Sequence, residues 1–213
     1  MAKSAGIDIV EVDAQQLDRL IESDENHQGV ALKAGPLPEL SLVELLEVAG
    51  RKTEGGRRLL ALDGVEDPQN VGAVARVAES AGVSGMILTE RRAPALTASV
   101  ARASAGAIEW LPVARVANLG RALSELQAKD YWVLAAALGA DGTLYQMEDR
   151  ILTGNLVVVL GAEGRGVRPS TLDQADHRVE IPMKGHVGSL NVSTAGAVLL
   201  YDLLRRAECG ADD

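Results

Sequence analysis

Apolar segments of strand length alternate with segments of helical periodicity from residue 58 to the C-terminus, and this alternation is the strongest constraint on the fold. Such alternation is typical of a mostly parallel sheet with helices on both faces. The apolar run at 156–161 has the composition of a strand buried on both sides. We therefore expect an α/β fold, with strands at LLALDGV, GMILT, EWLPV, WVLAAAL, LVVVLG and HRVEIPM and helices at 71–81, 96–104, 118–128, 170–175 and 195–204.

The N-terminal part has a different pattern. Alternating residues predict strands at 7–12 and 27–33, with a short helix at 14–22 between them. Glycine and proline at 35–38 interrupt the pattern, and a leucine-rich helix at 41–48 precedes a polar connector at 51–58. We interpret 1–34 as a separate N-terminal segment, 35–57 as a linker and 58–213 as the main domain.

Charge and composition limit the partners of this chain. Its 213 residues carry a net charge of −9, so any contact with nucleic acid must be local. Aromatic residues make up 2% and there is no Phe, which disfavours recognition of bases by stacking and leaves charge and shape. Basic residues do cluster, although each cluster by itself is more typical of a solvated face: Arg51/Lys52, Arg57/Arg58, Arg91/Arg92, Arg205/Arg206, and Arg165 with Arg168.

Several kinds of site and location are disfavoured. No apolar run approaches the length of a membrane span and the first residues lack a long apolar signal, so we expect a soluble, cytoplasmic protein without membrane contact. Cys209 is the single cysteine and cannot form an internal disulfide. The histidines, His27, His177 and His186, are scattered, and no cluster has metal-ligand spacing, so we expect no metal.

Polar residues gather among glycines at the ends of three apolar strands. The segments are DPQNVGAVAR at 67–76, LGAEGRG at 160–166, and SLNVS at 189–193, which follows IPM at 181–183. Each has an ordinary explanation: a helix cap at Asn70 or near Asn191, and a tight turn at Glu163. Since sites in parallel sheets form at the carboxyl ends of strands, three such ends in one domain predict one site.

The glycine-rich segment limits the chemistry of that site. Its spacing, G-x-x-G-x-G, fits neither the dinucleotide-binding nor the P-loop pattern. A nicotinamide oxidoreductase therefore lacks its fingerprint, and a serine hydrolase lacks the G-x-S-x-G elbow.

Taken together, the motifs DPQNVGAVARVAESAGV, LVVVLGAEGRGV and IPMKGHVGSLNVSTAGAVLLYDLLRR resemble those of the SpoU/TrmH RNA ribose 2′-O-methyltransferases of the SPOUT superfamily. They occur in the family's order, and the similarity extends over 58–206. The resemblance implies a C-terminal deep trefoil knot, bound S-adenosylmethionine, RNA as substrate and an obligate homodimer whose subunits complete the site. By position, Gly161, Ile181 and Leu190 match cofactor-contacting residues, and the catalytic and site-shaping set is matched by Asn70, Arg76, Glu163, Ser189 and Asn191.

The resemblance also suggests a role for each polar residue. Arg76 is the family's candidate for activating the ribose 2′-OH, yet arginine is a reluctant base because its pKa exceeds about 12. We therefore hypothesise that Arg76 holds the ribose or its phosphate and stabilises the developing alkoxide. Asn70, Glu163, Ser189 and Asn191 would hold Arg76 and the cofactor loops in register.

Longer members of the family carry an N-terminal RNA-binding domain resembling ribosomal protein L30e. Residues 6–34 resemble only its closing strand-helix-strand portion, so we interpret 1–34 as a remnant of that domain and expect RNA affinity to depend on other contacts as well. The leading hypothesis is a methyltransferase acting on tRNA or rRNA. The alternative is a non-catalytic RNA-binding or ribosome-assembly protein that retains the knotted fold; the motifs do not name the RNA or the nucleotide.

Overall fold

The computed structural model describes residues 6–20, 27–50, 56–140, 142–152 and 154–209. The chain divides into two compact units, Met1–Pro36 and Leu37–Asp213. This division lies inside the predicted linker 35–57.

The first unit contains helix α1 (Ala14–Leu20), which confirms the helix predicted at 14–22 as far as residue 20; residues 21 and 22 lie outside the described part. The strands predicted at 7–12 and 27–33 are wrong, since neither segment forms a strand. A strand needs a neighbour for its backbone groups and a surface for its apolar face. Ile9, Val10 and Val30 are 55%, 78% and 74% exposed, so no such surface covers them.

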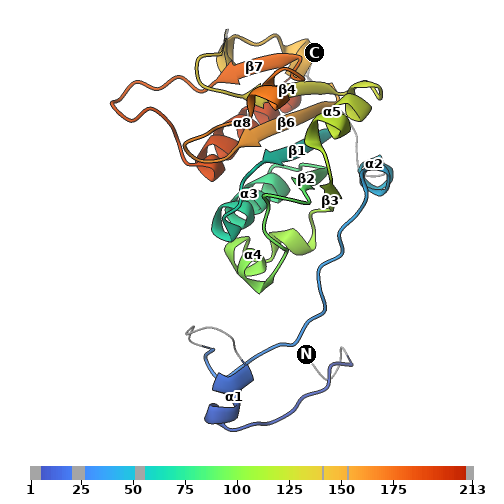
Figure 1. The fold of residues 1–213 in the computed structure, drawn as a ribbon, viewed down its shortest axis with the longest axis vertical. Coiled ribbons are helices and arrows are strands. Elements are labelled where there is room, and N and C mark those ends of the chain that lie inside the picture. The colour runs from blue at the N-terminus through green and yellow to red at the C-terminus, as the bar shows by residue number, and fades with distance from the viewer. Residues whose placement is uncertain (1–5, 21–26, 51–55, 141, 153, 210–213) are drawn as a thin grey trace. The chain divides into compact units, whose positions relative to one another are not determined.

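The second unit is built on a seven-stranded sheet in the order β3-β2-β1-β6-β4-β7-β5 (Figure 1). Every pair of neighbouring strands is parallel, which confirms the predicted sheet. The strands are β1 (Arg58–Asp63), β2 (Gly85–Thr89), β3 (Val113–Val116), β4 (Trp132–Ala136), β5 (Gly142–Thr143), β6 (Leu156–Gly161) and β7 (His177–Glu180). All but the last residue of β6 are buried, as its unbroken apolar run predicts.

Helices cover both faces of this sheet. Successive residues of β1 enter different apolar clusters: Leu60 packs with α3 (Pro68–Ser80), α4 (Ala98–Ala103) and α8 (Val192–Cys209), whereas Leu59 packs with α2 (Leu42–Ala49) and α5 (Leu119–Gln127). Because side chains alternate along a strand, the two clusters lie on opposite faces. The shorter helices are α6 (Asp149–Leu152), α7 (Pro169–Leu172), and the 3₁₀ turns η2 (Ala107–Glu109) and η3 (Leu144–Gln146).

Helix α2 confirms the helix predicted at 41–48 and lies in the segment interpreted as a linker. Its start is fixed by a capping box, in which the Ser41 hydroxyl accepts from the Glu44 N–H and the Glu44 carboxylate accepts from the Ser41 N–H. Leu45 is fully buried, and a Cβ on Gly85 would lie 2.4 Å from its Cδ1. This part of the predicted linker therefore packs tightly against the sheet.

One strand begins later than predicted, and the segment before β6 was not predicted. In the segment EWLPV, Glu109 ends η2, the next three residues form no strand, and the strand starts at Val113, because Pro112 lacks the N–H that a strand interior needs. The sequence patterns also missed β5, η3 and α6. Within the described residues no helix is both long enough and apolar enough to cross a membrane.

Candidate active site

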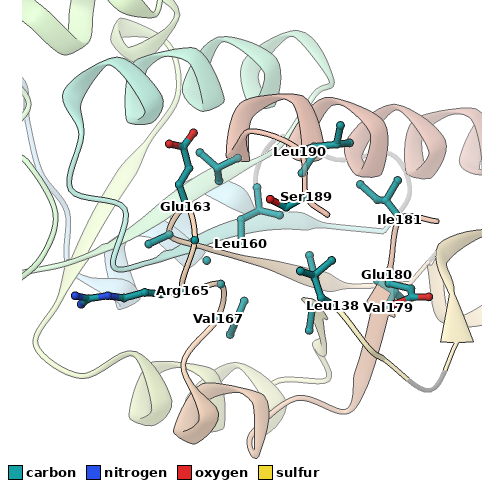
Figure 2. A pocket seen from close by; sticks show the side chains of 18 of the residues that line it. Leu138, Leu160, Glu163, Arg165, Val167, Val179, Glu180, Ile181, Ser189 and Leu190 are labelled. Carbon is teal, nitrogen blue, oxygen red and sulfur yellow. The ribbon is translucent and has the colours of Figure 1, made fainter. Parts of the chain in front are cut away.

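A pocket of about 290 Å³ opens at the carboxyl ends of β4, β6 and β7 (Figure 2). The residues before α8 close one side of it, and the glycine loop after β6 closes another. Its apolar wall includes Leu138, Leu160, Val179, Ile181, Met183 and Leu190, and its polar side chains include Glu163, Arg165, Glu180 and Ser189. The pocket therefore offers an apolar surface bordered by two carboxylates.

The glycine loop folds back directly onto the strand that precedes it. A Cβ on Gly161 would lie 1.9 Å from the carbonyl carbon of Gly166, so no side chain fits there. Gly166 donates its N–H to the Ala162 carbonyl at 2.8 Å, and both Gly164 and Gly166 have positive φ, at 74° and 65°. The three glycines therefore allow the backbone to form one wall of the pocket.

An ion pair fixes the end of this loop to β1. Asp63 is 1% exposed, and its carboxylate accepts from the Arg168 Nε at 2.6 Å and from the Arg168 backbone N–H at 2.9 Å. In the sequence, Arg168 stands out only as part of a basic cluster, and Asp63 was not predicted to belong to the site. An acidic residue that ends an apolar strand was the available signal, since a buried carboxylate needs a partner.

Asn191 joins two segments that are far apart in the sequence. Its Nδ2 donates to the Asn70 Oδ1 at 2.9 Å and to a carboxylate oxygen of Glu163. Its Oδ1 accepts from the Ser193 N–H at 2.8 Å and from the Ser193 hydroxyl at 2.6 Å, which caps the start of α8. The expected cap and the expected site contact are thus made by different atoms of one amide.

The structure brings together most of the predicted site residues. Five of them line the pocket: Gly161, Glu163, Ile181, Ser189 and Leu190. Asn191 adjoins it through its bond to Glu163, and Asn70 through its bond to Asn191.

Arg76 lies apart from this group. It is exposed on α3, does not line the pocket and has no hydrogen bond or ion pair to another residue in the described parts of the chain. It follows Asn70 by six residues, which at 3.6 residues per turn places it on another side of the helix. Among the described residues, no group of three or more Cys, His, Asp and Glu side chains could hold a metal ion.

Two family models match the chain. The one described as the SpoU rRNA Methylase family covers residues 57–201, and the one described as RNA 2′-O ribose methyltransferase substrate binding covers residues 1–40.

Relatives and solved structures agree with these matches. The chain is 42% identical over 202 residues to the 23S rRNA (guanosine-2′-O-)-methyltransferase RlmB of Pasteurella multocida, covering 94% of this chain and 80% of that protein. It is 41% identical to the RlmB of Pseudomonas aeruginosa, covering 97% and 81%. A structure of an AdoMet-bound rRNA methyltransferase from Sinorhizobium meliloti matches with a TM-score of 0.68 and 25% identity, covering 79% of this chain and 61% of that one. The chain therefore belongs to the SpoU family of S-adenosylmethionine-dependent RNA ribose 2′-O-methyltransferases.

Proposed function

We propose that this chain methylates the ribose 2′-OH of a guanosine in 23S rRNA. The observation that carries the proposal is the pocket enclosed by the glycine loop and by the segment before α8, with the Asn70–Asn191–Glu163 contacts at its side. The names of the RlmB relatives support the RNA and the nucleotide.

The pocket fits the cofactor of the family. S-adenosylmethionine carries an apolar adenine face and a positive sulfonium, and the pocket has an apolar wall with the carboxylates of Glu163 and Glu180. Gly161, Ile181 and Leu190 would hold it, the first through a backbone that approaches closely and the others through apolar contact. When bound, it supplies a methyl group that is activated for attack by a nucleophile.

The protein then has to position and activate the 2′-OH. We assign to Arg76 the binding of the target ribose or its phosphate and the stabilisation of the developing alkoxide, with removal of the 2′-OH proton coupled to that phosphate. Its exposed guanidinium, without a partner in the described residues, supports contact with a ligand from outside the chain. The Asn191 contacts orient the Glu163 side chain at the edge of the pocket, and Ser189 borders the same space.

The N-terminal segment supports RNA binding in this proposal. We propose that 1–34 belongs to an L30e-like RNA-binding module, and the match of the substrate-binding family model to residues 1–40 supports this proposal. We place the protein in the cytoplasm, where ribosomal RNA would be its substrate.

We further propose a homodimer in which the subunits complete each other's sites. The separation of Arg76 from the pocket of its own chain supports this arrangement. Light scattering should then give twice the 22.3 kDa chain mass. A stable monomer that is fully active would contradict it.

Methyl transfer provides the test of function. The full chain, with labelled S-adenosylmethionine and unmodified 23S rRNA or total tRNA, should place one 2′-O-methyl group on a guanosine of the rRNA, mapped by resistance to alkaline cleavage. Methylation of tRNA alone would contradict the proposed substrate. Binding of the cofactor without transfer to either RNA would favour the non-catalytic RNA-binding or assembly protein.

A further inference from the structure

The loop that follows β2 lies at the same edge of the sheet as the pocket. Residues 90–97 connect β2 to α4, and β1 alone separates β2 from β6, the strand that leads into the glycine loop. All three strands are parallel, so their carboxyl ends share one edge. At roughly 4.8 Å per strand, the starts of the two loops are about 10 Å apart, within reach of a short stretch of single-stranded RNA.

Arg115 of β3 holds this loop in one conformation. Its side chain is 15% exposed and donates to the Thr89 carbonyl at 3.1 Å, to the Pro94 carbonyl at 2.5 Å and to the Glu39 carboxylate at 2.7 Å. The hydroxyl of the buried Thr89 also donates to the Arg91 carbonyl. The start and the middle of the segment are therefore fixed by bonds to its backbone.

The loop presents two arginine side chains that these bonds do not use. Arg91 and Arg92 are exposed, and within the described residues neither guanidinium has a hydrogen-bond or ion-pair partner. Several other arginines are paired: Arg168 with Asp63, Arg178 with Asp173, and Arg206 with Asp202. Even with the exposed Glu90 beside them, the loop keeps a net positive charge in a chain of net charge −9.

The backbone conformation of Arg92 independently indicates that the side chain at this position is functional. Its φ of 63° lies in the left-handed region, which favours Gly or Asn. An arginine at this position disfavours the conformation that the Arg115 contacts impose. Strain of this kind often accompanies a functional side chain.

From this geometry we infer that Arg91 and Arg92 form an RNA phosphate-binding site that holds the strand next to the target nucleotide. The planar guanidinium matches phosphate oxygens, and phosphate contacts position an RNA without reading its sequence. The inference rests on the proposed function, and it assigns to this loop the placement of RNA rather than the chemistry.

The test uses the full chain with both arginines replaced, Arg91→Gln and Arg92→Gly. Glycine suits the left-handed backbone, so the thermal unfolding midpoint should stay the same or rise. The control is Lys129→Gln, which also replaces an exposed cation with glutamine. Lys129 is an exposed cation at the turn between α5 and β4, at the opposite edge of the sheet. Binding of in vitro transcribed 23S rRNA is measured over a series of KCl concentrations, and S-adenosylmethionine binding by calorimetry.

We expect the double variant to bind the RNA roughly ten- to a hundredfold more weakly. The slope of log K for RNA binding against log salt concentration should be shallower by about 1.4, because each of the two lost phosphate contacts contributes about 0.7. The KM for RNA should rise with kcat nearly unchanged, and the cofactor affinity should equal that of the wild type. The control should bind RNA as the wild type does.

Three outcomes would overturn the inference: unchanged RNA affinity and salt slope, an equal loss in the control, or a loss of cofactor affinity that accounts for the effect. Failure of the proposed function is a separate result. A wild-type protein that methylates no RNA contradicts the function, whereas the comparison of RNA binding still decides the role of the two arginines.

Discussion

At the scale of single residues, Asn191 combines the start of a helix with the architecture of the site. Its oxygen caps α8 through Ser193, and its nitrogen donates to Asn70 and Glu163. An amide is suited to both tasks because its carbon carries an acceptor oxygen and a nitrogen with two donor hydrogens. The two contributions can therefore be separated by substitutions that keep the oxygen.

Asn191→Asp should preserve the fold and impair the reaction. Aspartate caps a helix about as well as asparagine, so the free energy of unfolding should change by less than about 1 kcal/mol. The donor is lost, however, and a carboxylate faces Glu163, so methyl transfer should fall roughly ten- to a hundredfold. Chemical denaturation and kcat/KM measure the two effects. Asn191→Ser keeps a cap and also removes the donor but adds no charge, so it separates the loss of the donor from the repulsion. Normal turnover in the aspartate variant would show that the contacts are dispensable.

Arg76→Lys tests the role proposed for this side chain. Lysine keeps the positive charge and loses the planar fork that binds two oxygens at once. We expect kcat to fall at least about tenfold while S-adenosylmethionine binding is unchanged, since Arg76 does not line the pocket. Arg121→Lys, at an exposed arginine of α5, is the control. Undiminished transfer in R76K would exclude the proposed role.

At the scale of elements, the glycine loop is shaped from both ends. Gly161 permits its close return to β6, and the Asp63–Arg168 pair fixes its far end to β1. The first contact is local, since Gly166 and Val167 follow Gly161 in the same loop, whereas the second joins the loop to another strand. The pocket wall therefore depends on the assembled strands as well as on the loop sequence.

Gly161→Ala should remove cofactor binding. The added Cβ would meet the backbone of Gly166 and Val167 at 1.9 and 2.1 Å, and backbone cannot rotate away as a flexible side chain can. The loop must shift, so we expect S-adenosylmethionine affinity to fall by about a hundredfold or more, measured by calorimetry, with a destabilisation of roughly 1–3 kcal/mol. Gly185→Ala is the control, since nothing lies within 4 Å of a Cβ there. Equal behaviour of the two variants would refute the steric argument.

Helix α8 is fixed to the segment before β6 by Arg206, which donates to Asp202 at 2.8 Å, to Asp149 at 2.5 Å and to the Met147 carbonyl at 3.2 Å. Burial raises the pKa of Asp202, but hydrogen bonds and charge from Arg205 and Arg206 outweigh it and hold the pKa below its ordinary value. The folded state thus favours the carboxylate. Its contribution to stability is complete above the ordinary pKa of 3.8 and is lost as pH falls through the lowered value.

Asp202→Asn should therefore lower the free energy of unfolding at neutral pH. It should also make that free energy fall less steeply as the pH is lowered. Urea denaturation between about pH 7 and pH 3 would measure both effects. Asp173→Asn is the control, since that carboxylate is 75% exposed and 3.4 Å from Arg178. If the variant loses stability in acid as steeply as the wild type does, Asp202 is not the group responsible for that loss.

At the scale of the whole molecule, strand order determines which segments meet. β6 lies between β1 and β4, and β7 follows β4, so residues 63, 161–168 and 181–191 converge although nearly 130 positions separate their extremes. Arg76, by contrast, stays outside the pocket of its own chain. The homodimer, the trefoil knot and the L30e-like origin of 1–34 stay predictions.

Mixing two inactive variants tests completion of the site by a second copy. Arg76→Ala keeps the pocket, and Gly161→Ala keeps Arg76. If the subunits complete each other's sites, joint unfolding and refolding should restore methyl transfer that neither variant has alone, because mixed dimers contain one intact site. Each variant refolded by itself is the control. An inactive mixture that contains dimers would place Arg76 and the pocket of one chain in the same site.

The sequence by itself determined the elements whose information is local. The parallel sheet, most of its helices and the gathering of Gly161, Glu163, Ser189, Leu190 and Asn191 followed from periodicity and from three motifs. The strands predicted at 7–12 and 27–33 failed because alternation shows that one face can be buried, not that a neighbour exists to bury it. Only the tertiary structure decided that α2 packs on the sheet and that Asp63 anchors the glycine loop. It alone decided as well that Arg115 holds the Arg91–Arg92 loop and that Arg76 lies outside the pocket. Each of these depends on where the partner of a side chain lies in space, and the order of strands in the sheet, rather than any local pattern, sets that position.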